Sequence, residues 1–499
     1  MIRTRTRLTT TGFVIVATRG LAVFLLIVTT ARCSRSGPVS TPSPTLRIGI
    51  GGVPQQAQEA GLRQMTGSLS SLEGLVVPYE DGRLRAWLAD SWTTSPDGLS
   101  VIVSLRHNAK FHDATPVTAA VVADVLKKGL PPLLGPAFSD VREITALSDW
   151  QLKIDFKRPS RFVVEALETP IRKPGSPDVG SGPYLTSATN SSQLLANTDY
   201  YLGRPNIDRI EFVPYATVRA AWAELLRGNI DMLYEVNIDA LDSLQSSNNI
   251  AVYSYVRHYQ YVLTFGSGAE ALAPREVRRA LNAAINRDGV IRSALGGHGI
   301  PSTGPVPPGH WALDQSAPRI GFDPQLAKTL AARHLRFTCL VPADSSYDRV
   351  AIAVKQQLAT AGVDMRIQEA PQEEILKATQ GGHFEAVLVD PIGGPSLFRS
   401  YRQFYSKTSF NPKPRSSAKV DATLDMIRHA VTDDEYRAAV SAFQQAIVDD
   451  PPALFLAWGE RARAVSRRFD VVTEEKGRDI LINLRLWRPA GMHQVVSRN

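Results

Sequence analysis

The chain has 499 residues, of which 43% are hydrophobic, and its formal net charge is +8. This length and composition can support two or three domain cores. Five arginines and no acidic residue lie within residues 1–32, so the rest of the chain has a net charge of only +3. That ordinary balance argues against a nucleic-acid-binding protein.

The N-terminal residues are typical of an export signal. In residues 1–32, scattered arginines precede the apolar run 21–28, which is too short to span a bilayer. Cys33 follows, and residues 33–45 have the Ser/Pro-rich composition of a flexible tether. The order predicts a lipoprotein signal in which Cys33 is lipidated. An uncleaved anchor at 13–28 and plain secretion are the alternatives, and all three place the globular part outside the cytoplasm.

The most informative stretch is 88–128, which predicts a strand, a turn, a strand and a helix. Residues 95–98, Ser-Pro-Asp-Gly, supply the Pro and Gly of a tight turn. Val101, Val103 and Leu105 then alternate with less apolar positions, as in a strand with one buried face. Thr118 is expected to cap a helix that runs to about residue 128.

Further elements are expected along the chain. Val277, Leu281 and Ile285 share one helical face, which places Arg278 and Arg279 outward. Other expected elements are strands at 46–50, 149–156, 210–213 and 454–458, helices at 218–227, 422–431 and 434–448, a strand–helix–strand unit at 335–368, and a buried strand within 383–395 that runs into a Gly-rich loop. Alternating helices and strands favour a mixed α/β class.

Two smaller features are expected to be structural. Cys339 lies in a predicted strand. With Cys33 lipidated it has no disulfide partner, and no Cys/His cluster for a metal surrounds it in the sequence, so a small core residue is expected. The arginines after residue 460 form a local cluster without interleaved aromatic residues and are expected to form a solvated face. They are Arg461, Arg463, Arg467 and Arg468.

The ordered segments LADSW, SPDG, LR, KFHD, TP and TA, within 88–119, resemble the best-known block of the bacterial extracellular solute-binding proteins that serve peptide and nickel importers. Further blocks beginning at Gly180, near 275 and near 420 resemble the same family in the same order. Two departures stand in the first block. The family usually has glycine at the position of Ala114 and aspartate at that of Val121.

The resemblance implies an α/β fold of two lobes, a periplasmic-binding-protein-like fold of type II with an extra subdomain inserted in lobe I. It also implies that the lobes close about a hinge on a ligand. The expected divisions are a signal peptide at 1–32, a tether at 33–45, a lobe I core at 46–73, 176–262 and 463–499, an inserted subdomain at 74–175, and lobe II at 263–462.

The same resemblance suggests the ligand-binding residues. Asp390 lies where peptide-binding members often carry an aspartate that pairs with the ligand's α-amino group, although it could instead cap a turn before Pro391. Arg399, Asn411 and Trp458 are further cleft candidates, and Trp311 could line a pocket. Peptide-binding members hold an extended ligand largely through its backbone.

The predicted function is therefore that of the binding component of an ABC importer, which delivers a peptide or peptide-like solute to a membrane permease. A monomer without cofactor, bound metal or nucleic acid is expected. No GxSxG, HExxH or phosphate-binding loop is present, which disfavours an enzyme. The alternative is a surface lipoprotein that acts as a scaffold or binds a non-peptide ligand such as haem, glutathione, a nickel chelate or a siderophore.

Overall fold

The computed structural model describes the chain from residue 43 onward, with several gaps. The described residues are 43–52, 73–176, 178–266, 268–343, 345–382, 384–390, 394–408, 417–474 and 479–491. They belong to one compact unit, Ser43–Asn499. The predicted signal peptide and Cys33 lie outside the described residues. No helix within these ranges is long and apolar enough to cross a membrane.

The largest element is an eleven-stranded mixed sheet. Its order is β15 (Asp364–Ala370), β14 (Arg336–Pro342), β16 (Ala386–Val389), β12 (Ile250–Phe265), β17 (Ala453–Ser466), β11 (Met232–Val236), β1 (Thr45–Ile50), β10 (Arg209–Pro214), β9 (Gln193–Ala196) and β8 (Tyr184–Thr186), with β13 (Gly299–Pro301) on β17.

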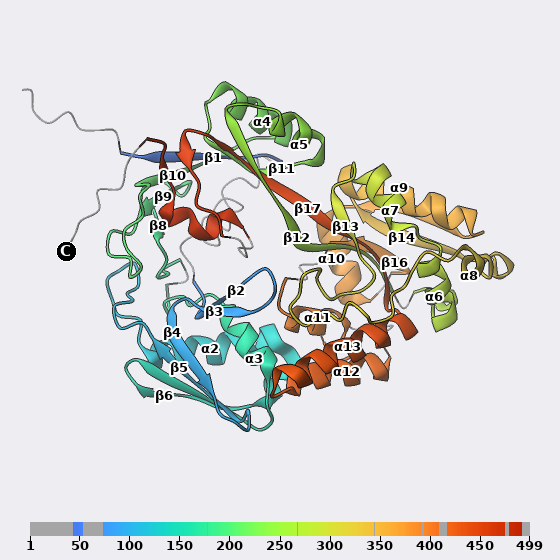
Figure 1. Cartoon of the computed structure of the whole chain (residues 1–499), viewed down its shortest axis with the longest axis horizontal. Coiled ribbons are helices and arrows are strands. Elements are labelled where there is room, and N and C mark those ends of the chain that lie inside the picture. The colour runs from blue at the N-terminus through green and yellow to red at the C-terminus, as the bar shows by residue number, and fades with distance from the viewer. Residues whose placement is uncertain are drawn as a thin grey trace, which may run out of the picture. The chain divides into compact units, whose positions relative to one another are not determined.

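Two long antiparallel strands, β12 and β17, connect the two parts of this sheet (Figure 1). Near one end of the pair, β17 also pairs with β11, and near the other end β12 pairs with β16. The register of the pair shifts between Val256 and Gln260 and again after Tyr261. The short strand predicted at 454–458 is therefore too short, because β17 continues to Ser466 along its partner.

A second, four-stranded sheet contains the two strands predicted within 88–128. Its order is β4 (Ala89–Thr94), β5 (Ser100–Leu105), β7 (Gln151–Phe156) and β6 (Val141–Ser148). The predicted turn between β4 and β5 is confirmed, with Gly98 at a φ of +69°. Ala114 has a φ of +66°, a region that glycine adopts at lower cost, which gives a physical reason for the glycine usual in the family at this position.

Helix α2 (Ala119–Leu134) packs on this sheet and begins as predicted. The Thr118 hydroxyl accepts a hydrogen bond from the Val121 amide at 3.5 Å. The predicted end near residue 128 is wrong by six residues, since the helix includes Pro131 and Pro132 in its last turns. It stops where Gly135 takes a φ of +54°.

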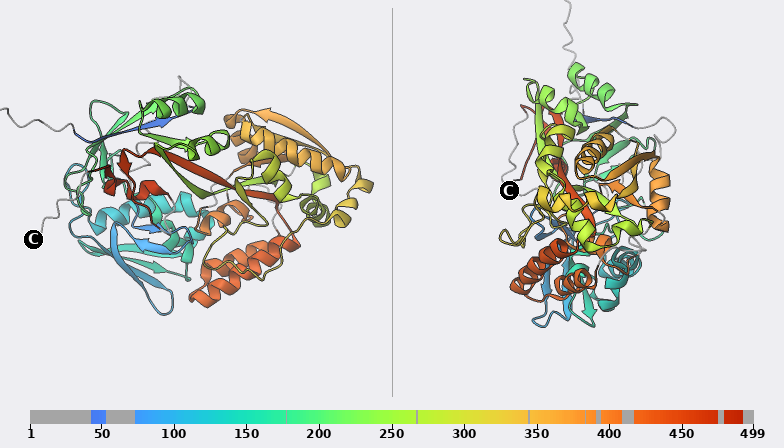
Figure 2. Two further views of the ribbon diagram at one scale, coloured as in Figure 1. Left: turned by 45° about the horizontal axis from the view of Figure 1, so that its top comes forward. Right: turned by 90° about the vertical axis from the view of Figure 1, so that its right-hand side faces the viewer.

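One hydrophobic core includes buried residues from 75–171 and from 397–455. It therefore joins the four-stranded sheet and α3 (Arg161–Glu165) to α11 (Phe398–Phe404), α12 (Ala418–His429) and α13 (Asp433–Asp449). These helices and the sheet lie side by side in Figures 1 and 2. The boundaries proposed for the lobes and the inserted subdomain stay a prediction.

A second core surrounds the strand–helix–strand unit. Strands β14 and β15 are parallel, and α9 (Ser345–Thr360) connects them, as the sequence predicted. Cys339 on β14 is completely buried, which confirms its assignment to the core. Burial raises the pKa of its thiol to about 12, so this side chain stays protonated at neutral pH.

The expectation for Arg278 on α6 (Arg275–Ala283) was wrong. Val277 and Leu281 are buried and Arg279 is exposed, as predicted, but Arg278 is only 3% exposed. Its guanidinium donates to the carbonyls of Leu272, Ala273 and Pro451 and pairs with Asp450. The chain that surrounds the helix thus supplies acceptors that periodicity does not reveal.

The expectation of a solvated arginine face after residue 460 was also wrong in part. Arg467 and Arg468 are exposed, whereas Arg463 is 5% exposed and pairs with Asp479. Arg461 is largely buried as well. On a strand, alternate residues point to opposite faces, and both faces of β17 carry neighbours here.

The remaining elements complete the described fold. They are β2 (Val76–Pro78), β3 (Leu84–Ala86), β18 (Phe469–Asp470), β19 (Arg488–Pro489), α4 (Val218–Arg227), α5 (Ile238–Gln245), α7 (Arg287–Ala294), α8 (Pro324–Lys328) and α10 (Gln372–Gly381), together with short 3₁₀ turns. The predicted helix at 218–227 is confirmed, with a Thr217 cap and a left-handed Gly228 at its end.

Candidate functional site

A charged cluster lies at the middle of the β12–β17 pair, between the part that pairs with β11 and the part that pairs with β16. Asp390, which directly follows β16, accepts a hydrogen bond from the Tyr347 hydroxyl on α9. Its other carboxylate oxygen is 3.7 Å from Nη2 of Arg461 on β17. The same guanidinium lies 3.5 Å from Oε1 of Glu235 on β11 and donates to the Tyr261 hydroxyl. Arg461 is thus shared between two carboxylates from opposite parts of the sheet.

This cluster is partly removed from water, which strengthens its interactions. The Arg461 side chain is 13% exposed. Burial, together with the charge of Asp390, raises the pKa of the Tyr347 hydroxyl above its ordinary value, so it remains a donor. Two carboxylates around one guanidinium carry a net negative charge, which suits a cationic group on an incoming ligand.

The other predicted site residues have different surroundings. Trp458 on β17 is 2% exposed and lies opposite Gln260 of β12 and Ile300 of β13. Arg399 on α11 pairs with Glu168. Asn411 lies outside the described residues. Asp390, Arg399 and Trp311 therefore occupy three separate environments.

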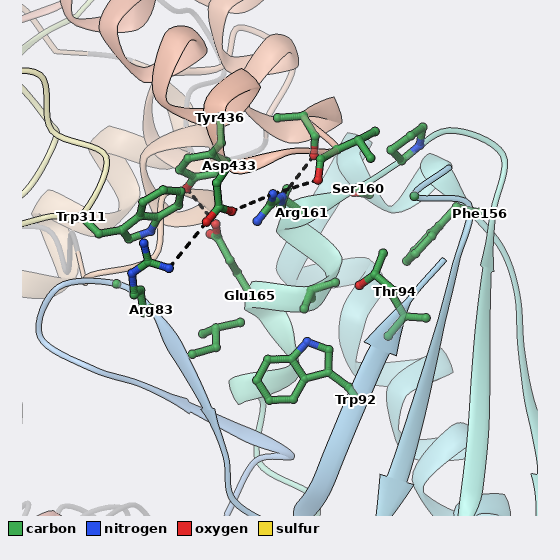
Figure 3. A pocket seen from close by; sticks show the side chains of 18 residues that line it. Arg83, Trp92, Thr94, Phe156, Ser160, Arg161, Glu165, Trp311, Asp433 and Tyr436 are labelled. Carbon is green, nitrogen blue, oxygen red and sulfur yellow. Dashed lines mark hydrogen bonds and ion pairs between the residues drawn. The ribbon is translucent and has the colours of Figure 1, made fainter. Parts of the chain in front are cut away.

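Trp311 lines a hollow of about 420 Å³ (Figure 3). The lining comes from the turn before β3, from β4, β5 and β7, from α3 and from the start of α13. The Trp311 indole stacks on the Tyr436 ring, with centroids 5.0 Å apart, and the Arg83 guanidinium covers it at 4.5 Å.

Two carboxylates lie in the wall of this hollow. Asp433 is 3.1 Å from Nη2 of Arg161 and 3.6 Å from Nη1 of Arg83. Glu165 accepts hydrogen bonds from the Phe398 amide at 3.0 Å and from the Tyr436 hydroxyl at 2.9 Å. Burial raises the pKa of Glu165 to about 7, although these hydrogen bonds act in the opposite direction.

Sequence reasoning missed most of these partners. Tyr347 and Glu235 belong to no motif, and Arg461 was placed on a solvated face. Arg83, Arg161 and Glu165 likewise carry no sequence signal beyond their charge. The one available signal was the position of Arg461 within a long apolar strand, where a charged side chain needs partners. Within the described ranges, no group of three or more His, Cys, Asp or Glu side chains could hold a metal ion.

Comparison with known proteins identifies relatives in one family. The model of the bacterial extracellular solute-binding proteins, family 5 Middle, matches residues 83–412, which is more than half of the chain. The probable D,D-dipeptide-binding periplasmic protein DdpA of Escherichia coli K12 is 24% identical over 403 residues, covering 74% of this chain and 78% of that protein. The glutathione-binding protein GsiB of the same strain is 27% identical over 282 residues, but the match spans only 55% of its length and 52% of this chain.

Solved structures share the fold. The oligopeptide-binding protein AppA of Bacillus subtilis, in complex with a nonapeptide, superimposes with a TM-score of 0.73 at 19% identity. The superposition covers 90% of this chain and all of the AppA chain. The predicted fold class, a two-lobed periplasmic-binding fold of type II, is confirmed by this likeness.

Proposed function

The chain belongs to the bacterial extracellular solute-binding proteins, family 5, which are binding components of ABC importers, and from this membership we propose that its cargo is a peptide or peptide-like solute. The observation that carries the proposal is the charged cluster at the β12–β17 crossing. There, carboxylates from two parts of the main sheet converge on Arg461. The relatives named for a dipeptide, for glutathione and for a nonapeptide complex support this ligand class.

Asp390 is the proposed anchor for a cationic group of the cargo. Its carboxylate already lies beside Arg461, so an incoming ammonium would take over part of that pairing. Arg461 retains Glu235 as a second partner 3.5 Å away, which keeps its charge compensated during this exchange. Arg399, Asn411, Trp458 and Trp311 remain weaker proposals for cargo contacts.

Family membership also leads us to propose the lobe boundaries, the hinge and the membrane attachment. Lobe I would include 46–73, 176–262 and 463–499, with the insertion at 74–175 and lobe II at 263–462. The β12–β17 pair would serve as the hinge region, because its two ends pair with different parts of the sheet. We further propose a monomer that is anchored through lipidated Cys33 and delivers unmodified cargo to a membrane permease.

The alternative that the sequence left open is a surface protein that kept the fold as a scaffold. A second alternative is a non-peptide cargo within the importer function. The relative named for glutathione favours a peptide-like molecule over a bare metal ion. These alternatives differ in whether the protein binds a soluble ligand at all and in which one it binds.

Thermal unfolding of the full chain against di- to octapeptides and the other ligand classes tests the proposal. A bound peptide should raise the unfolding midpoint in a saturable manner, because it binds only the folded state. Asp390→Ala should lower the affinity for that peptide by about tenfold or more, which is the effect of losing a charge-assisted hydrogen bond. The matched control is Asp364→Ala, which removes an exposed carboxylate on β15.

The outcomes separate the proposals. A peptide that binds equally well to Asp390→Ala would retain the cargo class and refute the anchor. A shift produced only by a non-peptide ligand would refute the peptide proposal. No shift from any member of the panel would favour the scaffold.

A further inference from the structure

The hollow around Trp311 has the features of a second ligand site. None of its lining residues belongs to β11, β12, β16, β17 or α9, the elements that hold the cluster around Asp390. Its volume of about 420 Å³ is within the range of small-molecule pockets. The lining joins the proposed insertion, through α3 and β4, to the start of α13 (Figure 3).

Two guanidinium groups in the hollow share one nearby carboxylate. Arg161 is 3.1 Å from Asp433 and also donates to the main-chain carbonyls of Ala430 and Val431. Arg83 approaches Asp433 only to 3.6 Å, and its side chain is 48% exposed. Within the described chain, the Arg83 guanidinium makes no hydrogen bond, so most of its five N–H donors are available to a ligand.

A third donor lies in the same wall. Ser160 is 4% exposed and lines the hollow, and its hydroxyl has no hydrogen-bond partner among the described residues. A buried hydroxyl without a partner is uncommon and calls for an explanation. An acceptor atom placed in the hollow would satisfy it.

Glu165 offsets little of this positive charge. Its carboxyl group is already engaged by the Phe398 amide and the Tyr436 hydroxyl. Burial raises its pKa to about 7, which leaves the group partly neutral at neutral pH. Asp433 is thus the main anion facing two arginines.

The rest of the lining is apolar and partly aromatic. Trp92, Val101 and Phe156 contribute side chains from β4, β5 and β7, and Trp311 closes the hollow from the other side. Flat aromatic walls favour a ligand with a flat apolar body.

We propose that this hollow binds a compact organic anion, a carboxylate attached to a flat apolar body. Arg83 and Arg161 pair with the carboxylate, and Ser160 donates a hydrogen bond to it. The body lies against the aromatic walls. Because α3 and α13 both contribute to the site, a bound anion holds the proposed insertion against the C-terminal helices.

Isothermal titration calorimetry of the full chain with phenylacetate tests the site. Saturable binding is expected, and phenylacetamide, which has the same shape without the charge, should bind at least about tenfold more weakly. Arg83→Gln should weaken phenylacetate by about fivefold or more, and Thr94→Trp should abolish binding by filling the hollow. Arg336→Gln, which removes an exposed arginine on β14, serves as the matched control and should bind normally.

Arg83 and Thr94 are chosen because both are exposed and neither supports the core, whereas Arg161 also holds two carbonyls. Asp390→Ala should retain phenylacetate binding, which would separate this site from the cargo site. Equal affinity for the acid and the amide would overturn the proposal. Unchanged binding of phenylacetate in both Arg83→Gln and Thr94→Trp would also overturn it. A third such result would be the failure of all three aromatic acids, benzoate, phenylacetate and indole-3-acetate, to bind the wild type.

Discussion

Replacement of Asp140 by alanine should lower the free energy of unfolding by about 3–5 kcal/mol, the usual cost of removing one partner from a buried ion pair. Asp140 is completely buried between the four-stranded sheet and α12. Its carboxylate lies 2.8 Å from Arg158, 3.2 Å from Arg428 and 3.4 Å from His429. The alanine variant leaves the Arg428 charge buried, with Asp425 as its one remaining acidic partner among the described residues. Equilibrium unfolding in urea measures the loss.

A surface carboxylate provides the control for this experiment. Asp124 pairs with Lys128 one turn along α2, and both side chains are exposed. Asp124→Ala should therefore change stability by about 0.5 kcal/mol or less. Introducing Arg428→Met into Asp140→Ala should recover part of the loss, because it removes the stranded charge. If Asp140→Ala lowered the free energy of unfolding by less than about 1 kcal/mol, the buried ion pairs of Asp140 would not stabilise the fold as described.

Arg278→Ala is expected to have the second large effect, a loss of about 3 kcal/mol or more. The guanidinium satisfies three main-chain carbonyls and Asp450, and all of these acceptors lose their donor together. Buried acceptors without a partner cost about 1–3 kcal/mol each where water cannot reach them. The unfolding midpoint in urea again gives the measurement.

The next residue on the same helix is a matched control. Arg279 is exposed, so Arg279→Ala should stay within about 0.5 kcal/mol of the wild type. If the two variants lost stability equally, the effect would come from helix propensity or net charge, and the proposed role of Arg278 in joining α6 to the segment before β17 would be refuted.

Local patterns in the sequence were sufficient for most elements. The β4–β5 turn follows from Ser-Pro-Asp-Gly, and the limits of α4 follow from Thr217 and Gly228, because each is set by residues adjacent in the chain. The parallel β14–α9–β15 unit also follows from local periodicity. Fold class required the family resemblance in addition, since no local pattern specifies the order of an eleven-stranded sheet.

The features that could not be predicted from the sequence depend on contacts between distant segments. Arg278 was expected at the surface from helical periodicity, and Arg463 from the charged cluster to which it belongs. Their partners come from other segments: Asp450 lies 172 positions from Arg278, and the carbonyl that Arg463 binds belongs to Tyr234. The length of β17 was underestimated for a similar reason. Its second half is stabilised by β11 and β12 on either side, despite three charged residues between Trp458 and Ala464.

Single residues of the candidate site could be named from the sequence, but the partners that surround each of them could not. Asp390 was suggested by the family resemblance, but its partners Tyr347 and Arg461 lie on α9 and β17, which the resemblance did not indicate. Trp311 was expected to line a pocket, and it lines the hollow that Arg83 and Arg161 share. Which charges meet across such distances is decided by the sheet order, and that order becomes visible only in the folded chain.

A solute-binding protein of this fold should close its two lobes on a bound peptide, and the distance between the lobes measures that closure directly. Spin labels at Leu226→Cys on α4 and Leu376→Cys on α10, both exposed sites, would report the distance between lobes by double electron–electron resonance. Cys33→Ser prevents the proposed lipidation and leaves no cysteine there to react with the label, and Cys339 is buried. A bound peptide should shorten this distance, while the distance within a control pair at Ile352 and Leu376, both in the proposed lobe II, should stay constant. An unchanged distance with every member of the peptide panel would contradict this expectation.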